Sequence, residues 1–124
     1  MARWLLILGG INALLAVALG AFAAHGLKGL LDPGQLATFR TGVHYQTWHA
    51  LGLILIGLVS ERRPGVRMLW RAGSLILAGI VLFSGSLYLL ALTGVPMIGA
   101  ITPVGGLALL LGWLLFVVAI WKDK

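Results

Sequence analysis

The residues best suited to chemistry gather in one stretch, residues 39–55, which reads FRTGVHYQTWHALGLIL. This stretch places His44, Tyr45 and His49 directly beside the start of a long apolar run. Imidazole binds zinc, copper and haem iron, and it can also carry protons. Because polar groups at the mouth of a lipid-buried helix are costly, they need either partners or a function there.

The spacing of the histidines limits the metal sites that they could form. His44 and His49 lie five residues apart, about 140° around a helix, so they do not make the i, i+4 pair of helical metal sites. A shared metal would need His25, with Asp32 supplying an oxygen ligand. Since a histidine near the membrane interface usually serves as a hydrogen-bonded structural residue, we expect no metal and no cofactor. Proton handling is the other functional alternative.

Tyr45 and His49 stand at i and i+4 and therefore share one helix face. In the structural interpretation Tyr45 is an interfacial aromatic residue, and His49 hydrogen-bonds to another helix at Tyr88, His25 or Thr102. In the functional interpretation the pair binds a lipid headgroup, a quinone or a small polar solute. Interfacial aromatic residues are frequent, which favours the structural interpretation. The candidate polar cluster comprises His25, His44, Tyr45, Gln46, His49, Tyr88 and Thr102.

The composition places these residues in a membrane protein. Of 124 residues, 60% are hydrophobic and 10% are charged, and the mean hydropathy is +1.06. A soluble domain has about 25% charged residues, and so small a domain could not hide this much apolar surface from water. The absence of cysteine excludes disulfides, thiolate catalysis and cysteine-based metal sites.

Apolar runs of about 20 residues predict helices that cross a bilayer. The first run could also be a secretory signal, but it is longer than a signal core of about 7–15 residues. Within it, Ala16, Gly20 and Ala24 form a small-residue stripe that allows another helix to approach closely. The predicted spans are residues 4–24, 43–60, 72–92 and 104–121.

The segment before the second span also has a helical pattern. Asp32 is a suitable N-cap, Pro33 a suitable first helical residue, and Gln35 completes a capping box. A helix over residues 33–60 would be about 42 Å long, whereas the hydrocarbon core is about 30 Å thick. Its first turns should therefore lie at the outer interface or bend there, most easily at Gly42.

These elements predict an all-α membrane protein, with one domain over residues 1–124 that forms an up-down bundle of four transmembrane helices. Nine Lys and Arg against three Asp and Glu give a net charge of +6. The basic residues flank apolar runs, so they indicate topology and contact with anionic headgroups rather than nucleic acid binding. Positive residues stay inside, which places both termini in the cytoplasm. The main topology residues are Arg62, Arg63, Arg67 and Arg71.

Four motifs, one in or beside each span, resemble those of a known family. They are GAFAAHGLK (20–28), FRTGVHYQTWHAL (39–51), LFSGSLYLLALTG (82–94) and ITPVGGLALLLGW (101–113). They are similar to domain-of-unknown-function family 423, which includes eukaryotic transmembrane protein 256. The resemblance implies a four-helix protein of the bacterial inner membrane with no established activity. The family pattern falls on Gly20, His25, Gly26, Tyr45, His49, Ser84, Tyr88, Thr102, Pro103 and Gly105.

The predicted spans contain no Asp, Glu, Lys or Arg, and the chain has no phosphate loop and no Ser/His/Asp arrangement. Asp32 and Glu61 fall on opposite sides of the membrane, so they cannot act as a carboxylate pair. We therefore expect a structural or accessory membrane component rather than an enzyme. We expect this component to pack as a homo-oligomer or within a larger membrane complex. The alternatives are a small-solute channel or transporter built from an oligomer, and a protein that binds a metal or haem through histidine.

Overall fold

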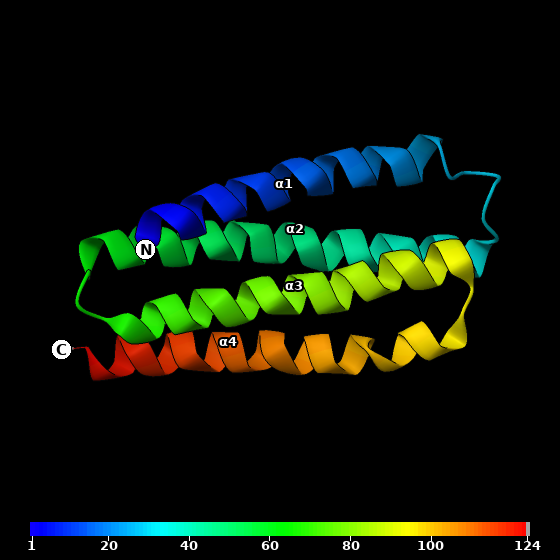
Figure 1. Cartoon of the computed structure of the whole chain (residues 1–124). Helices are drawn as coiled ribbons and strands as arrows, with labels where there is room; N and C mark the ends of the chain where they lie inside the picture. Colours follow the sequence, from blue (N-terminus) through cyan, green and yellow to red (C-terminus); the bar gives the residue numbers. More distant parts are fainter. Residues whose placement is uncertain (124) are drawn as a thin grey trace.

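The computed structural model describes residues 1–123, which fold into helices only, apart from the connections. The long helices run side by side and alternate in direction, and they form one elongated body (Figure 1). This confirms the predicted all-helical, up-down order. The elements are α1 (Ala2–His25), α2 (Pro33–Arg62), α3 (Arg67–Thr93), the short 3-10 helix η1 (Pro96–Ala100) and α4 (Thr102–Lys122).

The start of α2 is fixed by the predicted capping box. The backbone N–H of Gln35 donates to the Asp32 carboxylate at 2.7 Å, and the Asp32 N–H donates to the Gln35 side chain at 3.2 Å. Two backbone donors that the helix itself cannot satisfy are thereby paired. The expected ordered helix before the second span is confirmed, and it continues as one helix through Gly42 to Arg62.

Gly42 is a packing position rather than the expected bend. A Cβ atom there would lie 2.7 Å from Cε1 of Tyr88 and 3.3 Å from the Ser84 carbonyl oxygen. The Ser84 hydroxyl also donates to the Gly42 carbonyl oxygen at 2.7 Å. The missing side chain therefore lets α2 and α3 come close enough to share a hydrogen bond.

Only three segments of the described chain are long and apolar enough to cross a membrane by composition. They are α1, α3, and the combined segment Pro96–Lys122 that contains η1 and α4. The predicted second span, residues 43–60, is not among them, so the prediction of four spans is not met by this criterion. The reason is local, because His44, Gln46 and His49 lower the hydropathy of its first half.

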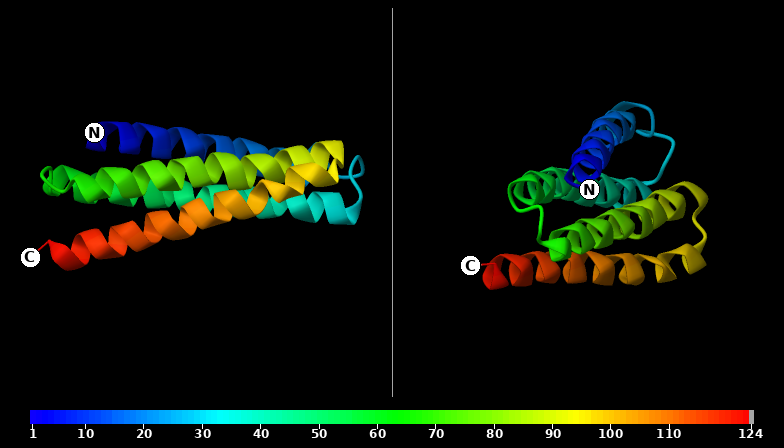
Figure 2. Two further views of the ribbon diagram at one scale, coloured as in Figure 1. Left: turned by 60° about the horizontal axis from the view of Figure 1, so that its bottom comes forward. Right: turned by 60° about the vertical axis from the view of Figure 1, so that its left-hand side comes forward.

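The helices pack in sequence order and do not close into the bundle that we expected. α1 packs mainly on α2, α2 on α3, and α3 on α4, and the views in Figure 2 show this staggered arrangement. One face of α1 and one of α4 consequently stay exposed, for example at Leu14 and Leu110. The main core cluster contains Leu5, Leu53, Ile56, Leu69, Ile76, Ile80, Leu109 and Ala119.

Small residues set the close contacts of α1, but not along the whole predicted stripe. Ala16 is buried, Gly20 is partly buried and Ala24 is exposed. Gly9 carries a contact that the stripe did not include, since a Cβ there would lie 3.0 Å from the Ala50 carbonyl oxygen. The buried line of α1 runs along the whole helix, through Leu5, Gly9, Asn12, Ala16 and Ala23.

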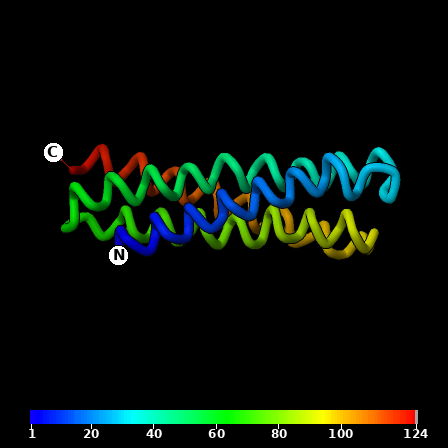
Figure 3. Tube along the Cα trace, turned by 90° about the horizontal axis from the view of Figure 1, so that it is seen from above, coloured from blue at the N-terminus to red at the C-terminus, as the bar shows by residue number. Residues whose placement is uncertain are grey.

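Both ends of the described chain lie at the same end of the molecule as the connection between α2 and α3 (Figure 3). An ion pair between Arg63 and Asp123 joins that connection to the residue after α4. Arg62, Arg67 and Arg71 are exposed at the same end. The four predicted topology arginines thus share one end of the helices.

Candidate functional site

Three helices are joined by a chain of hydrogen bonds between side chains. The Gln46 amide donates from Nε2 to Oδ1 of Asn12 at 3.0 Å, and the Tyr88 hydroxyl donates to Oε1 of Gln46 at 2.6 Å. Asn12 in turn donates from Nδ2 to the Leu8 carbonyl oxygen at 2.9 Å. We call Asn12, Gln46 and Tyr88 the three-helix network. Its hydrogen bonds join α1 to α2 and α3 to α2, and so fix how the three helices are aligned along their axes.

A second polar contact fixes α4 to α3. The hydroxyls of Ser86 and Thr102 lie 2.6 Å apart, and the Ser86 hydroxyl donates to the Phe83 carbonyl oxygen at 2.9 Å. The Thr102 hydroxyl is therefore the donor to Ser86. Of the candidate polar cluster, Thr102 thus serves in helix packing at the start of α4.

His49 does not make the predicted hydrogen bond across the bundle. Its Nδ1 lies 2.7 Å from the carbonyl oxygen of Tyr45 in its own helix, while Tyr88 and Thr102 bond to other residues. A carbonyl oxygen can only accept, so Nδ1 carries the proton and Nε2 has a free lone pair. The predicted shared face is present, because the rings of Tyr45 and His49 are stacked with centroids 6.0 Å apart.

The structure keeps the three histidines apart. His25 and His44 are exposed, whereas His49 is buried. The end of α1 that carries His25 packs near Phe39 of α2, because Phe22 contacts Phe39. His49 lies ten residues after Phe39, about 15 Å further along α2. Within residues 1–123, no three His, Cys, Asp or Glu side chains are placed to hold one metal ion. The structure thus does not bring His25 and His49 together.

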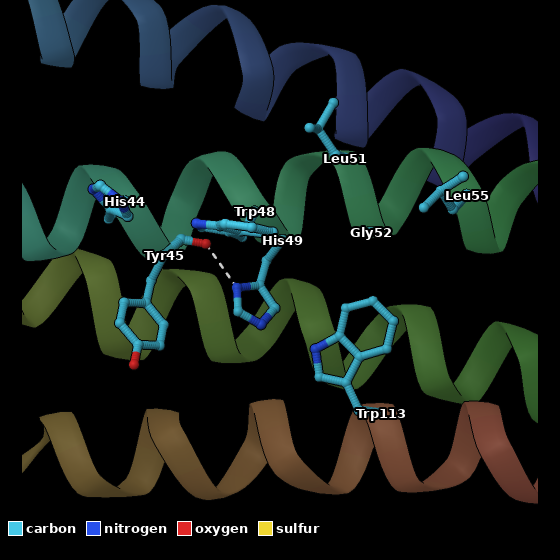
Figure 4. A pocket seen from close by; sticks show the side chains of 8 residues that line it. All are labelled: His44, Tyr45, Trp48, His49, Leu51, Gly52, Leu55 and Trp113. Carbon is cyan, nitrogen blue, oxygen red and sulfur yellow. Dashed lines mark hydrogen bonds between the residues drawn. The ribbon is translucent and has the colours of Figure 1, made fainter.

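Beside the three-helix network, an open groove runs between α2 and α4. It consists of two adjoining hollows of about 660 and 620 Å³, and both are lined by Tyr45, His49 and Trp113. We call these hollows together the α2–α4 groove. Figure 4 shows the first hollow, with Trp113 of α4 facing the aromatic side chains of α2. Its other lining residues are His44, Trp48, Leu51, Gly52 and Leu55.

Two residues of this region were missed by the sequence analysis. Asn12 is the one strongly polar side chain between Trp4 and Ala24, so a buried polar partner such as Gln46 could have been expected for its amide. Trp113 gave no such signal, because an aromatic residue in an apolar run is compatible with any lipid-facing or buried position. Its place opposite His49 depends on how α4 packs on α3, which no local pattern determines.

Comparison with known proteins identifies the chain's relatives. Residues 19–106 match a family described as "Protein of unknown function (DUF423)". The chain is 50% identical over 117 residues to the UPF0382 membrane protein YwdK of Bacillus subtilis, covering 94% of this chain and 95% of that protein. It is 49% identical to a UPF0382 membrane protein of Staphylococcus epidermidis over 117 residues, covering 94% of each chain. No solved structure matches. The chain therefore belongs to the DUF423 family of membrane proteins whose activity is unknown.

Proposed function

We propose that this protein is an accessory component of the bacterial inner membrane that acts by binding rather than by catalysis. The three-helix network carries this proposal, because it commits the buried amides and the Tyr88 hydroxyl to bonds between helices. Polar side chains used in this way make a defined scaffold. The exposed faces of α1 and α4 are then available to lipid, to a second copy or to a larger complex.

We further propose that α2 crosses the membrane together with the other long helices. Residues 41–60, between Arg40 and Glu61, are uncharged and span about 30 Å as a helix, which matches the hydrocarbon core. The polar side chains that lower its hydropathy include Gln46, whose amide is bonded to α1 and α3 and so does not face lipid. Packing of α2 against both α1 and α3 also supports a common transmembrane orientation.

The same arrangement supports cytoplasmic termini. The arginines at the α2–α3 connection share one end of the molecule with Met1 and Asp123 (Figure 3). Basic residues near the ends of spans remain in the cytoplasm. Exposed arginines there would also contact anionic headgroups, each contributing about 1 kcal/mol of attraction.

Cysteine crosslinking in native membranes tests the accessory role, since the chain has no cysteine of its own. Leu14→Cys on α1 and Leu110→Cys on α4 lie on the exposed faces, where the side chains are 68% and 70% exposed. We expect one of these variants to crosslink to a second copy or to one reproducible partner. Ala50→Cys, which is 0% exposed, is the matched control and should not crosslink. Absence of any crosslink from both exposed faces would contradict the proposal.

A further inference from the structure

His49 holds an unused hydrogen-bond acceptor at the wall of the α2–α4 groove. The side chain is 8% exposed, and its Nδ1–H donates a hydrogen bond to the Tyr45 carbonyl oxygen. Among residues 1–123, every completely enclosed polar side-chain atom has a hydrogen-bond partner. Nε2 of His49, in contrast, has no hydrogen-bond partner in this part of the chain. Nε2 is therefore not sealed inside the protein but reaches the groove, which His49 lines.

A donor faces this acceptor from the other side of the groove. The rings of His49 and Trp113 have centroids 5.9 Å apart, and Figure 4 shows the indole nitrogen of Trp113 on the side of its ring that faces His49. An indole N–H can only donate. Within the described part of the chain it has no acceptor, so α2 and α4 present one acceptor and one donor to the same space.

The position of the pair determines the kind of molecule that can reach it. His49 lies near the middle of the uncharged stretch 41–60, about 14 Å along the helix from Arg40. With α2 crossing the membrane, as proposed above, the groove at that depth opens toward lipid tails rather than water. Aromatic side chains stand in its walls among aliphatic ones, with Tyr45 and Trp48 in one hollow and Phe83 in the other. A ligand should therefore be lipid-soluble and should offer a flat ring to these aromatic faces.

We propose that the α2–α4 groove binds a lipid-soluble molecule of the phenol or hydroquinone class, whose hydroxyl donates to Nε2 of His49 and accepts from Nε1 of Trp113. A hydroxyl is the simplest group that both donates and accepts. A carbonyl or an ether oxygen could accept from Trp113, but it would place a lone pair against that of His49. This inference goes beyond the accessory role, which needs no small ligand.

The test uses the full-length protein, labelled with ¹⁵N-histidine, in lipid nanodiscs. The probe is 4-octylphenol, and the matched control is its methyl ether, 1-methoxy-4-octylbenzene, which lacks only the donor. We expect the Nε2 resonance of His49 to shift with the phenol, saturably in its mole fraction in the lipid, and not with the ether. The exposed His25, which does not line the groove, is the internal control and should not respond.

Two variants separate binding at His49 from partition into lipid. The resonance of His49 is assigned by its loss in His49→Phe. In tryptophan-fluorescence titrations this variant should bind the phenol about threefold to tenfold more weakly, as expected for the loss of one neutral hydrogen bond. Its affinity for the phenol should then equal its affinity for the ether. Gly106→Leu should fill the second hollow and weaken binding of the phenol while His49 is intact. A Cβ atom at Gly106 would lie 3.7 Å from Phe83, an ordinary contact, so this variant should fold.

Several results would overturn the proposal. Equal shifts with phenol and ether would show that no hydroxyl is recognised. No shift with either probe would show that the groove does not bind this class. An Nε2 resonance that is already hydrogen-bonded before the probe is added, and that stays unchanged, would show that water alone occupies the site. Unchanged binding of the phenol by both His49→Phe and Gly106→Leu would place the probe outside the groove.

Discussion

At the scale of single residues, Gln46 connects more of the structure than any histidine does. Its two amide atoms bond to Asn12 on one side and to Tyr88 on the other. Hydrogen bonds between membrane helices average about 0.6 kcal/mol and reach about 1.7 kcal/mol. The network is therefore worth most as a means of fixing which faces meet, and its energy is measurable by substitution.

We expect Gln46→Leu to lower the free energy of unfolding by about 1 to 2 kcal/mol, because two interhelical bonds are lost and two partners remain unpaired. Tyr88→Phe removes one of these bonds and should cost less. Unfolding in mixed micelles by titration with a denaturing detergent measures both. Thr47→Val is the control, since the Thr47 hydroxyl bonds only within α2, to Val43. Equal stability of Gln46→Leu and Thr47→Val would contradict a structural role for the network.

Sequence patterns predicted the residue types of the site better than their partners. Tyr45 and His49 share a face as their spacing requires, and Asp32 caps α2 as predicted. The partner of His49 was predicted wrongly because a histidine can satisfy one nitrogen on the carbonyl four residues earlier in its own helix. Spacing along one helix therefore does not determine which nitrogen of a histidine remains available.

At the scale of helices, the contact between α3 and α4 depends on glycines whose missing side chains face backbone. A Cβ atom at Gly105 would collide with the backbone of Leu82 and Phe83. Backbone cannot move aside as a flexible side chain can, so the two helices would have to separate. Overpacking of this kind costs about 1 to 3 kcal/mol.

Gly105→Ala should accordingly destabilise the protein by about that amount and weaken the contact between Ser86 and Thr102. Gly85→Ala is the matched control, because a Cβ atom at Gly85 meets nothing within 4 Å. Thermal unfolding of the two purified variants in the same detergent makes the comparison. If Gly85→Ala proved as harmful as Gly105→Ala, the loss would reflect general sensitivity of glycines rather than this helix contact.

The capping box at the start of α2 yields a local prediction. Asp32→Ala removes the acceptor of the Gln35 N–H and should cost about 1 kcal/mol. Hydrogen exchange should then become faster at the first turns of α2 and stay unchanged near Gln46. Asp32→Asn keeps an acceptor at the N-cap and should retain slow exchange. Uniform acceleration along α2 would show that the cap holds more than its own end.

At the scale of the whole molecule, labelling of single cysteines tests whether α2 crosses the membrane. Gly34→Cys and Gly65→Cys lie close to the two ends of this helix. We expect the first to react with an impermeant reagent added from outside, together with Gly99→Cys before α4, and the second to react only from the cytoplasm. Reaction of both α2 positions from one side would overturn the proposal of four spans.

The overall arrangement could be predicted only in part. Apolar length and the capping box at Asp32 and Gln35 indicated helices, because both are local properties of the chain. Whether four helices close into a ring or stay staggered depends on the pairing of particular faces, such as Gly79 against Leu109. α4 is nearly uniformly apolar, so hydropathy does not distinguish the side facing α3. Only residue size marks that side, through the buried Gly105, Gly112 and Ala119 at intervals of seven residues.

The staggered packing also has a consequence for how the protein is made. Each helix rests chiefly on the one synthesised immediately before it, so contacts can form as the chain leaves the ribosome and enters the membrane. Asn12, Gln46 and Tyr88 are all present once α3 has been made. The first three helices can therefore lock together before α4 exists, and α4 then docks on a surface that is already assembled.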